Sequence, residues 1–333
     1  MQEKILVLGS NSFTGTHFIK SALEQGANVI GINRSKETHS VMLSHRQLDE
    51  KLQEQYQFFQ LDINHDLDYI MDITQSFQPN YVVNFAAQGM VGQSWNHPEQ
   101  WFQTNTLVQV ALHERLRKIK TLKKYVQIST PEVYGVCVGR VKEHTHYQAS
   151  TPYGVSKAAA DMSLMSYLRA YQFPVVFTRA ANVYGTSQQL YRIIPRTILY
   201  ILLNKTLYLH GGGLSKRAFV HILDVADATL KIMRSAVPGS IYHLSTDEVV
   251  SIRQLVEMIV DIMGVRFEEH VVLVEEDRLG KDPEYLLDCT QAEKDLAWKP
   301  KYSLYKGLTE VIGWVESNID ILKDFELDYV HKI

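Results

Sequence analysis

The stretch KILVLGSNSFTG, Lys4–Gly15, carries the clearest indication of the fold. Its first six residues form a short apolar run that ends in glycine, and the helical spacing that follows stops at Gly26, a typical helix C-cap signal. Between the predicted strand and helix, Gly9, Ser12 and Gly15 give the spacing G-x-x-S-x-x-G. Glycines at such a turn let the backbone approach a pyrophosphate, and the helix N-terminus favours its negative charge. The stretch therefore predicts the first βα unit of a dinucleotide-binding fold.

The same alternation continues along the chain. Further strands are expected at Asn28–Ile32, Tyr56–Ile63, Tyr81–Ala87, Lys123–Ser129 and Pro174–Ala180, with long helices near residues 99–118 and 151–171. Continuous apolar strands that alternate with helices argue for a parallel sheet covered on both faces. Right-handed crossovers make such a sheet doubly wound. The sequence predicts an α/β fold with a doubly wound parallel (Rossmann) sheet.

The regular alternation stops near residue 182. Later segments such as TLYLHGGG and RAFVHILDVADATLKIM predict a smaller α/β unit, and no low-complexity linker precedes it. We expect a dinucleotide-binding domain over residues 1–181, which carries the catalytic residues. A smaller C-terminal α/β unit over residues 182–333 should bind substrate, with some exchange of chain between the two. A ligand cleft lies most naturally where they meet.

The composition excludes several classes of function. The 333 residues are 45% hydrophobic and 21% charged, with a formal charge of -3, which argues against nucleic-acid binding and polybasic membrane binding. Two cysteines without a Cys-x-x-Cys motif and scattered histidines predict no disulfide framework and no metal site. We see no signal peptide and no apolar run of ~18 residues that could span a membrane, so a cytoplasmic location is expected.

The residues expected to contact a cofactor follow the predicted strands. After the second strand, INRSK offers Arg34 where a carboxylate usually accepts hydrogen bonds from the adenosine ribose. Because Arg34 could pair with a 2′-phosphate, the sequence favours NADP over NAD; the alternative is a solvated loop charge beside NAD. The full set is Gly9, Ser12, Phe13, Thr14, Gly15, Asn33, Arg34, Ser35, Asp62, Ile63, Ala86, Ala87, Gln88, Thr104, Ser129, Tyr153 and Lys157.

The segment TPYGVSK places Tyr153 and Lys157 four residues apart, on one face of a predicted helix. A phenol has a pKa of about 10, and a nearby ammonium and an oxidised nicotinamide both favour its phenolate. A second Tyr-x-x-x-Lys, in KYSLYKG, lies far from the nucleotide motifs and reads as surface. Tyr153 begins the helix after the fifth strand, and Thr130 and Glu132 follow that strand directly. These four residues should converge as a catalytic centre at the carboxyl edge of the sheet.

In combination, the motifs GSNSFTG, NFAAQ, STPEVYG, TPYGVSK, TRAANVYG and RLGKDPEYLLD resemble the extended short-chain dehydrogenase/reductase family. Within it, nearly the whole chain resembles the nucleotide-sugar 4,6-dehydratases. The resemblance implies that a nucleotide-activated hexose is converted to its 4-keto-6-deoxy derivative on a tightly bound, recycled cofactor. Tyr153, assisted by Thr130 and Lys157, would remove the C4 hydroxyl proton. Glu132 would take the C5 proton before water leaves from C6.

Pro131 departs from one pattern within that group. The dTDP-glucose 4,6-dehydratases carry an Asp at this position, which protonates the departing hydroxyl, and proline cannot do so. The GDP-mannose 4,6-dehydratases also lack the Asp, and NFAAQ and the arginine after the second strand resemble them too. Glu132 is then expected to serve as base and afterwards as acid.

The resemblance also implies a substrate site and a dimer. The expected substrate-binding residues are Gln88, Asn182, Arg192, Arg217, Arg278 and Tyr285. The guanidinium groups of Arg217 and Arg278 suit diphosphate oxygens, although each could be a surface charge. The helices near residues 99–118 and 151–171 form the dimer in the resembling family, so we expect a homodimer; ordinary packing on the sheet is the alternative.

Other activities remain open on the same fold. A sugar 4-epimerase needs Tyr153 and Lys157 but no carboxylate at position 132, and a reductase would consume NADPH in each turnover. A non-catalytic nucleotide-binding protein is a further alternative, for which Pro131 would mark a degenerate site. The sequence leaves the nucleotide base and the hexose undetermined.

Overall fold

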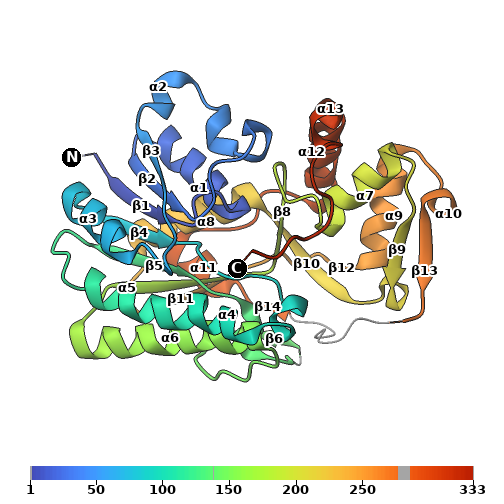
Figure 1. Cartoon of the computed structure of the whole chain (residues 1–333). Coiled ribbons are helices and arrows are strands. Elements are labelled where there is room, and N and C mark those ends of the chain that lie inside the picture. Colours follow the sequence, from blue (N-terminus) through green and yellow to red (C-terminus); the bar gives the residue numbers. More distant parts are fainter. Residues whose placement is uncertain (1, 138, 277–285, 333) are drawn as a thin grey trace.

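The structure is a computed structural model that describes residues 2–137, 139–276 and 286–332. Within these residues, seven parallel strands form the central sheet in the order β11-β7-β5-β4-β1-β2-β3 (Figure 1). Its strands are β1 (Lys4–Leu8), β2 (Asn28–Asn33), β3 (Tyr56–Gln60), β4 (Tyr81–Asn84), β5 (Lys124–Ile128), β7 (Val175–Ala180) and β11 (Ile241–Leu244). The chain moves outward from β1 in both directions, so the strand order reverses between β1 and β4. The predicted doubly wound α/β fold is confirmed.

Helices cover both faces of the sheet, and this explains the continuous apolar strands. They are α1 (Phe13–Glu24), α3 (Leu67–Phe77), α4 (Pro98–Phe102), α5 (Val108–Leu116), α6 (Pro152–Tyr171), α8 (Ile222–Ser235) and α11 (Thr290–Leu296). One core packs α1, α8 and α11 against the sheet, and another packs α3, α5 and α6 against the opposite face. Figure 1 shows α5 and α6 side by side beneath the sheet.

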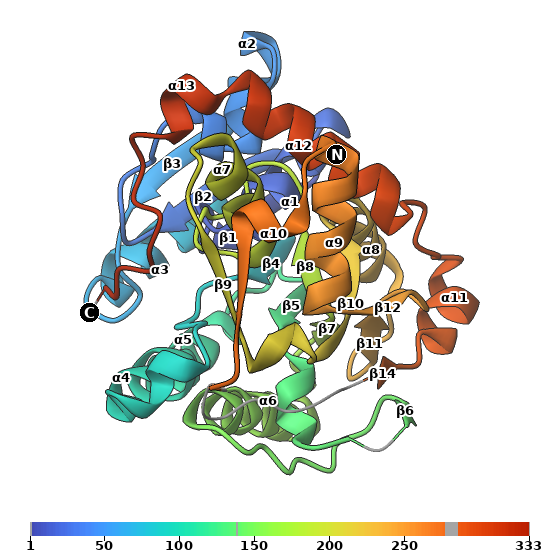
Figure 2. The same cartoon turned by 90° about the vertical axis from the view of Figure 1, so that its right-hand side faces the viewer.

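The second unit has its own core, centred on α7, α9 and α12. It holds β8 (Asn182–Tyr184), β9 (Leu207–His210), β10 (Lys216–His221), β12 (Val249–Ser251), β13 (Val271–Val274), α7 (Ile193–Leu202), α9 (Ile252–Met263), α10 (Phe267–His270), α12 (Leu304–Ser317) and α13 (Ile319–Leu322). Figure 2 shows β9, β13 and α9 on the side turned toward the viewer. The smaller elements of the first unit are α2 (Glu50–Gln53), β6 (Arg140–Val141) and β14 (Leu286–Leu287).

The two units exchange chain. β11 and α8 lie beyond residue 181 in sequence, yet β11 pairs with β7 and α8 packs on α1. The return of the chain to the first sheet places β8 and β10 directly beyond its carboxyl edge, where the predicted site residues lie.

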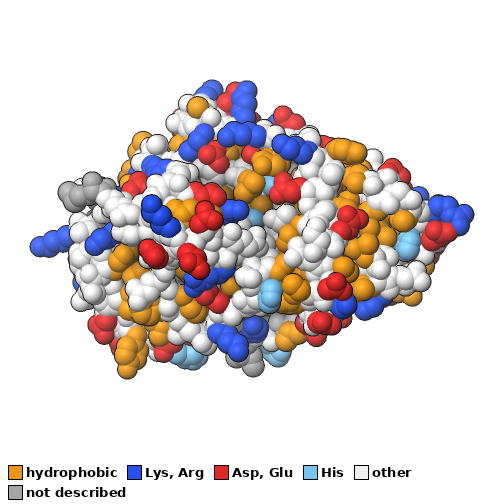
Figure 3. All heavy atoms as spheres, turned by 90° about the horizontal axis from the view of Figure 1, so that it is seen from above, with side chains coloured by type: hydrophobic (Ala, Val, Ile, Leu, Met, Phe, Trp, Pro, Cys, Tyr) orange, Lys and Arg blue, Asp and Glu red, His pale blue; other side chains and the backbone are white. Residues whose placement is uncertain are grey.

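The surface agrees with the balanced composition. Seen from above, acidic and basic side chains are interspersed among apolar ones (Figure 3). In the part of the chain that the structure describes, no helix combines the length and apolarity needed to cross a bilayer.

Candidate active site

The glycine-rich turn is closed by direct packing. Gly9 has a φ of +75°, and a Cβ there would lie 2.6 Å from the backbone nitrogen of Ala86, so glycine lets the turn after β1 touch the loop after β4. Ser12 caps α1, and its Oγ accepts a hydrogen bond from the N–H of Gly15 at 3.1 Å. The turn therefore presents its backbone and the start of α1 beside the β4 loop.

A cavity of about 310 Å³ lies beside this turn, at the carboxyl ends of β2, β3 and β4. The predicted cofactor residues that line it are Gly9, Ser12, Asn33, Arg34, Ser35, Asp62, Ile63, Ala86, Ala87, Gln88 and Thr104. Lys36 and Lys332 border it as well. Glycine backbone, a helix N-terminus and cationic side chains suit the phosphates of a dinucleotide, so the donor set fits the cofactor.

Other predicted cofactor residues lie elsewhere. Phe13 does not line the cavity; its ring is buried in the core, 5.3 Å from the ring of His17. Thr14 and Gly15 lie in the first turn of α1 and are also absent from the lining, because the helix carries them away from it. Ser129 points its hydroxyl to the carboxylate of Asp161 at 2.6 Å.

The start of α6 fixes the predicted Tyr–Lys pair. Thr151 is the N-cap, and its Oγ1 accepts from the N–H of Gly154 at 3.1 Å. Tyr153 lies in the first turn and Lys157 follows one turn later. The Nζ of Lys157 donates to the carbonyl of Ile128 at 2.7 Å, which ties α6 to the end of β5. Burial lowers the pKa of Lys157 to about 8, and the charge of Asp161 opposes this shift.

Pro131 has a definite place after β5. Thr130 has extended backbone and its Oγ1 accepts from the N–H of Glu132 at 3.3 Å, which caps a 3-10 turn over Pro131–Tyr134. Proline at the first position of a helical turn loses no hydrogen bond, because that N–H has no partner within the turn. The turn directs the chain so that Glu132 is half-buried next to the catalytic helix.

The backbones of the four predicted catalytic residues lie close together. A Cβ on Gly154 would lie 3.0 Å from the carbonyl oxygen of Glu132, so the residue after Tyr153 rests against the backbone of Glu132. Lys157 is held to the same end of β5, from which Thr130 follows two residues after Ile128. The segment that carries Thr130 and Glu132 therefore meets the start of α6, which carries Tyr153 and Lys157, at the carboxyl end of β5.

A buried polar network, which the sequence analysis did not predict, lies behind the four predicted catalytic residues, together called the catalytic wall. Arg179 of β7 donates to the carboxylate of Asp161 at 3.0 Å, and both side chains are fully buried. The same carboxylate accepts from Ser129, and the Arg179 guanidinium lies 4.6 Å from the ring centre of Tyr134. A signal existed, since Asp161 follows Lys157 by four residues on the same helix face. The network joins β5, β7 and α6.

A π turn forms a second support. The predicted helix over residues 99–118 is interrupted by π geometry at Gln103–Leu107. Asn105 in this turn accepts from the N–H of Gln88 at 2.8 Å and donates to its carbonyl at 3.0 Å, and also to Ser156 Oγ at 3.0 Å. Such turns are frequent at functional sites. Here the turn ties the loop after β4 to α6.

Among the predicted substrate residues, Gln88 lies after β4 in the first unit, and Asn182, Arg192 and Arg217 are spread over the second unit. Asn182 begins β8 in register with Phe219 of β10, and Arg217 lies two residues earlier on the same side of β10. Arg192 caps α7 and is exposed, with its guanidinium 5.4 Å from the ring centre of Tyr191. Arg278 and Tyr285 lie outside the described residues.

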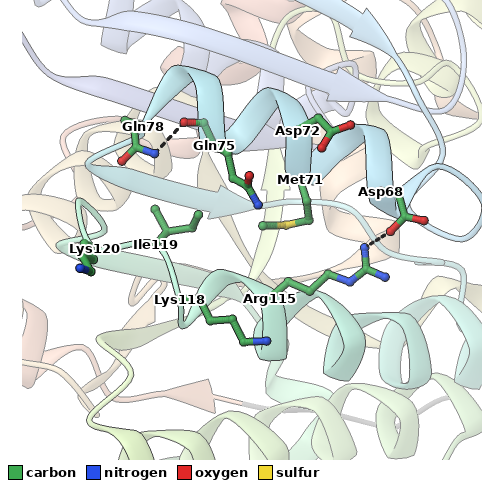
Figure 4. Close-up of a pocket in the computed structure, with 9 residues that line it drawn as sticks. All are labelled: Asp68, Met71, Asp72, Gln75, Gln78, Arg115, Lys118, Ile119 and Lys120. Carbon is green, nitrogen blue, oxygen red and sulfur yellow. Dashed lines mark hydrogen bonds and ion pairs between the residues drawn. The ribbon is translucent and has the colours of Figure 1, made fainter.

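A separate hollow of about 790 Å³ lies between α3 and α5 (Figure 4). Asp68 and Arg115 point toward each other across it and form an ion pair. None of the predicted site residues that the structure describes borders it. The predicted cofactor and catalytic residues therefore indicate a site at the carboxyl edge of the sheet and not in this hollow.

The fold, the glycine-rich turn and the Tyr-x-x-x-Lys helix after β5 define an extended short-chain dehydrogenase/reductase. A family model described as GDP-mannose 4,6 dehydratase matches residues 6–311, and the chain belongs to this family. It thereby falls in the nucleotide-sugar 4,6-dehydratase group.

Similar proteins agree with this placement. A dTDP-D-glucose 4,6-dehydratase from Homo sapiens is 30% identical over 97% of this chain and 93% of its own. The solved structure of DesIV, a dTDP-glucose 4,6-dehydratase from Streptomyces venezuelae with NAD bound, is 27% identical with a TM-score of 0.86, covering 95% of this chain and 98% of that one. A UDP-glucuronic acid 4-epimerase from Bacillus cereus, also with NAD, is 27% identical with a TM-score of 0.84, covering 94% and 99%.

Proposed function

We propose that this chain is a nucleotide-diphosphate-hexose 4,6-dehydratase, a hydro-lyase that forms a 4-keto-6-deoxy sugar. The observation that carries the proposal is the position of Glu132, whose backbone lies against the first turn of α6 beside Tyr153. A 4-epimerase or a reductase needs the Tyr–Lys pair but has no use for this carboxylate. Glu132 therefore favours dehydration over both alternatives.

The chain's own residues divide the work. Tyr153 accepts the proton of the C4 hydroxyl, and the ammonium of Lys157 on the same helix face favours its phenolate. Thr130 is placed to hydrogen-bond the same hydroxyl. A nicotinamide held beside the glycine-rich turn would accept hydride from C4 and supply it to C6 while C5 regains a proton from solvent. The 4-ketone acidifies the C5 proton, which Glu132 removes.

Glu132 also serves the leaving group. Pro131 has no ionisable group, and the residue stands where the turn needs only a fixed φ. The protonated Glu132 then donates its proton to the departing C6 hydroxyl, directly or through one water. One carboxylate can act as base and then as acid when both atoms lie on one face of the sugar.

The Glu132→Gln variant tests this assignment. With a panel of GDP-, dTDP-, UDP- and CDP-hexoses, the unaltered protein should give a product that develops near-ultraviolet absorbance in mild alkali. The variant should lose elimination by roughly 100- to 10,000-fold while it still oxidises C4. Undiminished dehydration in the variant would remove the role of Glu132. A panel without any 6-deoxy-4-keto product would end the dehydratase proposal.

The proposed cofactor is NADP, bound tightly and recycled. Arg34, Ser35 and Lys36 follow β2 and line the cavity where a carboxylate would otherwise meet the ribose. The similar solved enzymes named above hold NAD, so this choice rests on the residues at the end of β2. Mass spectrometry of ligands released from the purified protein identifies the dinucleotide directly.

The proposed assembly is a homodimer through α5 and α6. Val155 and Met162 lie seven residues apart on one face of α6 and are 41% and 59% exposed. Leu107 of the adjoining π turn is 61% exposed. Together they form an apolar strip that a second copy would cover. Sedimentation of the purified protein measures whether it is a dimer.

A cytoplasmic location is proposed from the sequence alone.

A further inference from the structure

The segment after α13, residues 325–332, crosses from the second unit to the first. Phe325 and Leu327 pack against the core of the second unit, and the carboxylate of Asp328 pairs with Arg196 of α7 at 2.9 Å. Figures 1 and 2 show this segment descending from α13 toward α4. The segment is therefore anchored on the second unit before it reaches the first.

Tyr329 marks the crossing. Its ring meets the ring of Tyr191 edge-on at 5.4 Å, next to the start of α7. Burial raises the pKa of Tyr329, and the charges of Arg34 and Arg192 oppose the rise. One of these arginines borders the cofactor cavity and the other is a predicted substrate residue. Tyr329 thus lies between the two binding regions.

His331 anchors the segment on the first unit. Its ring stacks on Trp101 of α4, with centroids 5.2 Å apart and an interplanar angle of 5°. Its Nε2 lies 2.5 Å from Oε1 of Gln100. Trp101 is fully buried, so the histidine rests on a fixed platform.

Lys332 lines the cofactor cavity and contacts the loops after both β4 and β2. Its carbonyl accepts from Nε2 of Gln88, after β4, at 2.8 Å. Its Nζ donates to Oγ of Ser35, after β2, at 3.3 Å. Together with Arg34 and Lys36 it lines the cavity, so three cationic side chains border the end near β2.

We propose that residues 329–332 form a strap that retains the dinucleotide, with Lys332 contacting a cofactor phosphate at the adenosine side. The inference rests on the proposed function, since it presumes a nicotinamide dinucleotide in this cavity. A redox-neutral cycle regenerates its cofactor in each turnover, so slow release does not limit the rate. An ammonium close to a phosphate slows release because separating the charges costs electrostatic energy.

The test is the dissociation rate of NADPH and of NADH from the full-length holoenzyme, followed by the loss of bound-cofactor fluorescence in a chase. Lys332→Ala should accelerate release about three- to tenfold, as expected for a charged contact at the surface. Removal of the sequence from residue 329 onward should accelerate it by roughly tenfold or more. Lys323→Ala is the matched control, since this exposed lysine pairs with Asp320 near α13.

The outcomes separate cleanly. Faster release of NADPH alone in Lys332→Ala assigns the contact to the 2′-phosphate, and equal acceleration of both cofactors assigns it to the pyrophosphate. Unchanged rates in both variants would overturn the strap. Slower release after truncation would overturn it as well, because the segment would then compete with the cofactor. The measurement contains no sugar, so it can fail while dehydration is observed, and the reverse.

Discussion

Two ion pairs of nearly equal length contrast the catalytic wall with the strap. Asp161 and Arg179 lie 3.0 Å apart behind the catalytic residues, and both side chains are 0% exposed. Asp328 and Arg196 lie 2.9 Å apart at the base of the strap, and their side chains are 72% and 28% exposed. Contact distance therefore does not measure an ion pair's contribution to stability, because burial decides how much the loss of one partner costs.

The wall and the strap also differ in how the chain builds them. Thr130, Glu132, Tyr153, Lys157 and Asp161 come from one short stretch of sequence that runs from the end of β5 into α6. The strap depends on contacts with residues more than 100 positions away, such as Arg196 and Gln88. The predicted catalytic residues are therefore close in sequence, whereas the strap depends on contacts between distant segments.

The largest effect is expected in the buried pair. Asp161→Asn should lower the free energy of unfolding by about 3–5 kcal/mol, because Arg179 would remain buried without its counter-charge. Urea unfolding of the purified variant measures the change. A loss of less than about 1 kcal/mol, as for a surface ion pair, would show that the catalytic wall does not depend on the Asp161–Arg179 network.

An intermediate effect is expected from pH. Lys157 carries its charge below a pKa of about 8, which burial has lowered, and loses it as the pH rises through that value. Since the ammonium favours the Tyr153 phenolate, kcat should fall roughly tenfold per pH unit above this point. Lys157→Arg retains the positive charge, so the pH above which kcat falls should move upward, although kcat itself should be lower than in the unaltered protein. An identical alkaline limit in both proteins would contradict the role of the ammonium.

The smallest effect is expected at the base of the strap. Asp328→Asn removes the charge from one partner of an exposed ion pair of nearly equal length. The free energy of unfolding should therefore fall by less than about 1 kcal/mol. The same urea titration serves as the counterpart to Asp161→Asn. Equal losses in the two variants would break the contrast between the regions.

The sequence predicted the sheet, and the proximity of the end of β5 to the start of the next long helix, for a clear reason. Apolar runs bounded by glycines and helical segments carry their own signal, and Tyr153 and Lys157 share a helix whose start follows β5. The π turn at Gln103–Leu107 could not be predicted, since the apolar spacing around it is that of a continuous helix. β11 was not identified because its run Ile241–Leu244 is short and contains a histidine.

The strap was not predictable from local pattern. Tyr329, His331 and Lys332 follow the final helix, after an apolar–polar alternation over Phe325–Tyr329 that forms no strand in the structure. Their positions come from Tyr191, Trp101 and Gln88, which lie far away in sequence. Only the tertiary structure places this lysine beside Ser35.

Redox-neutral dehydration is tested most directly with a nucleotide-activated hexose labelled with deuterium at C4. A redox-neutral dehydratase should give a 4-keto-6-deoxy product with the deuterium at C6, detected by mass spectrometry and NMR. Deuterium returned to C4 of a sugar that keeps its C6 hydroxyl would identify an epimerase. Hexose recovered unchanged, with its deuterium still at C4, would leave only a reductase or a non-catalytic protein, and either result would contradict the dehydratase account.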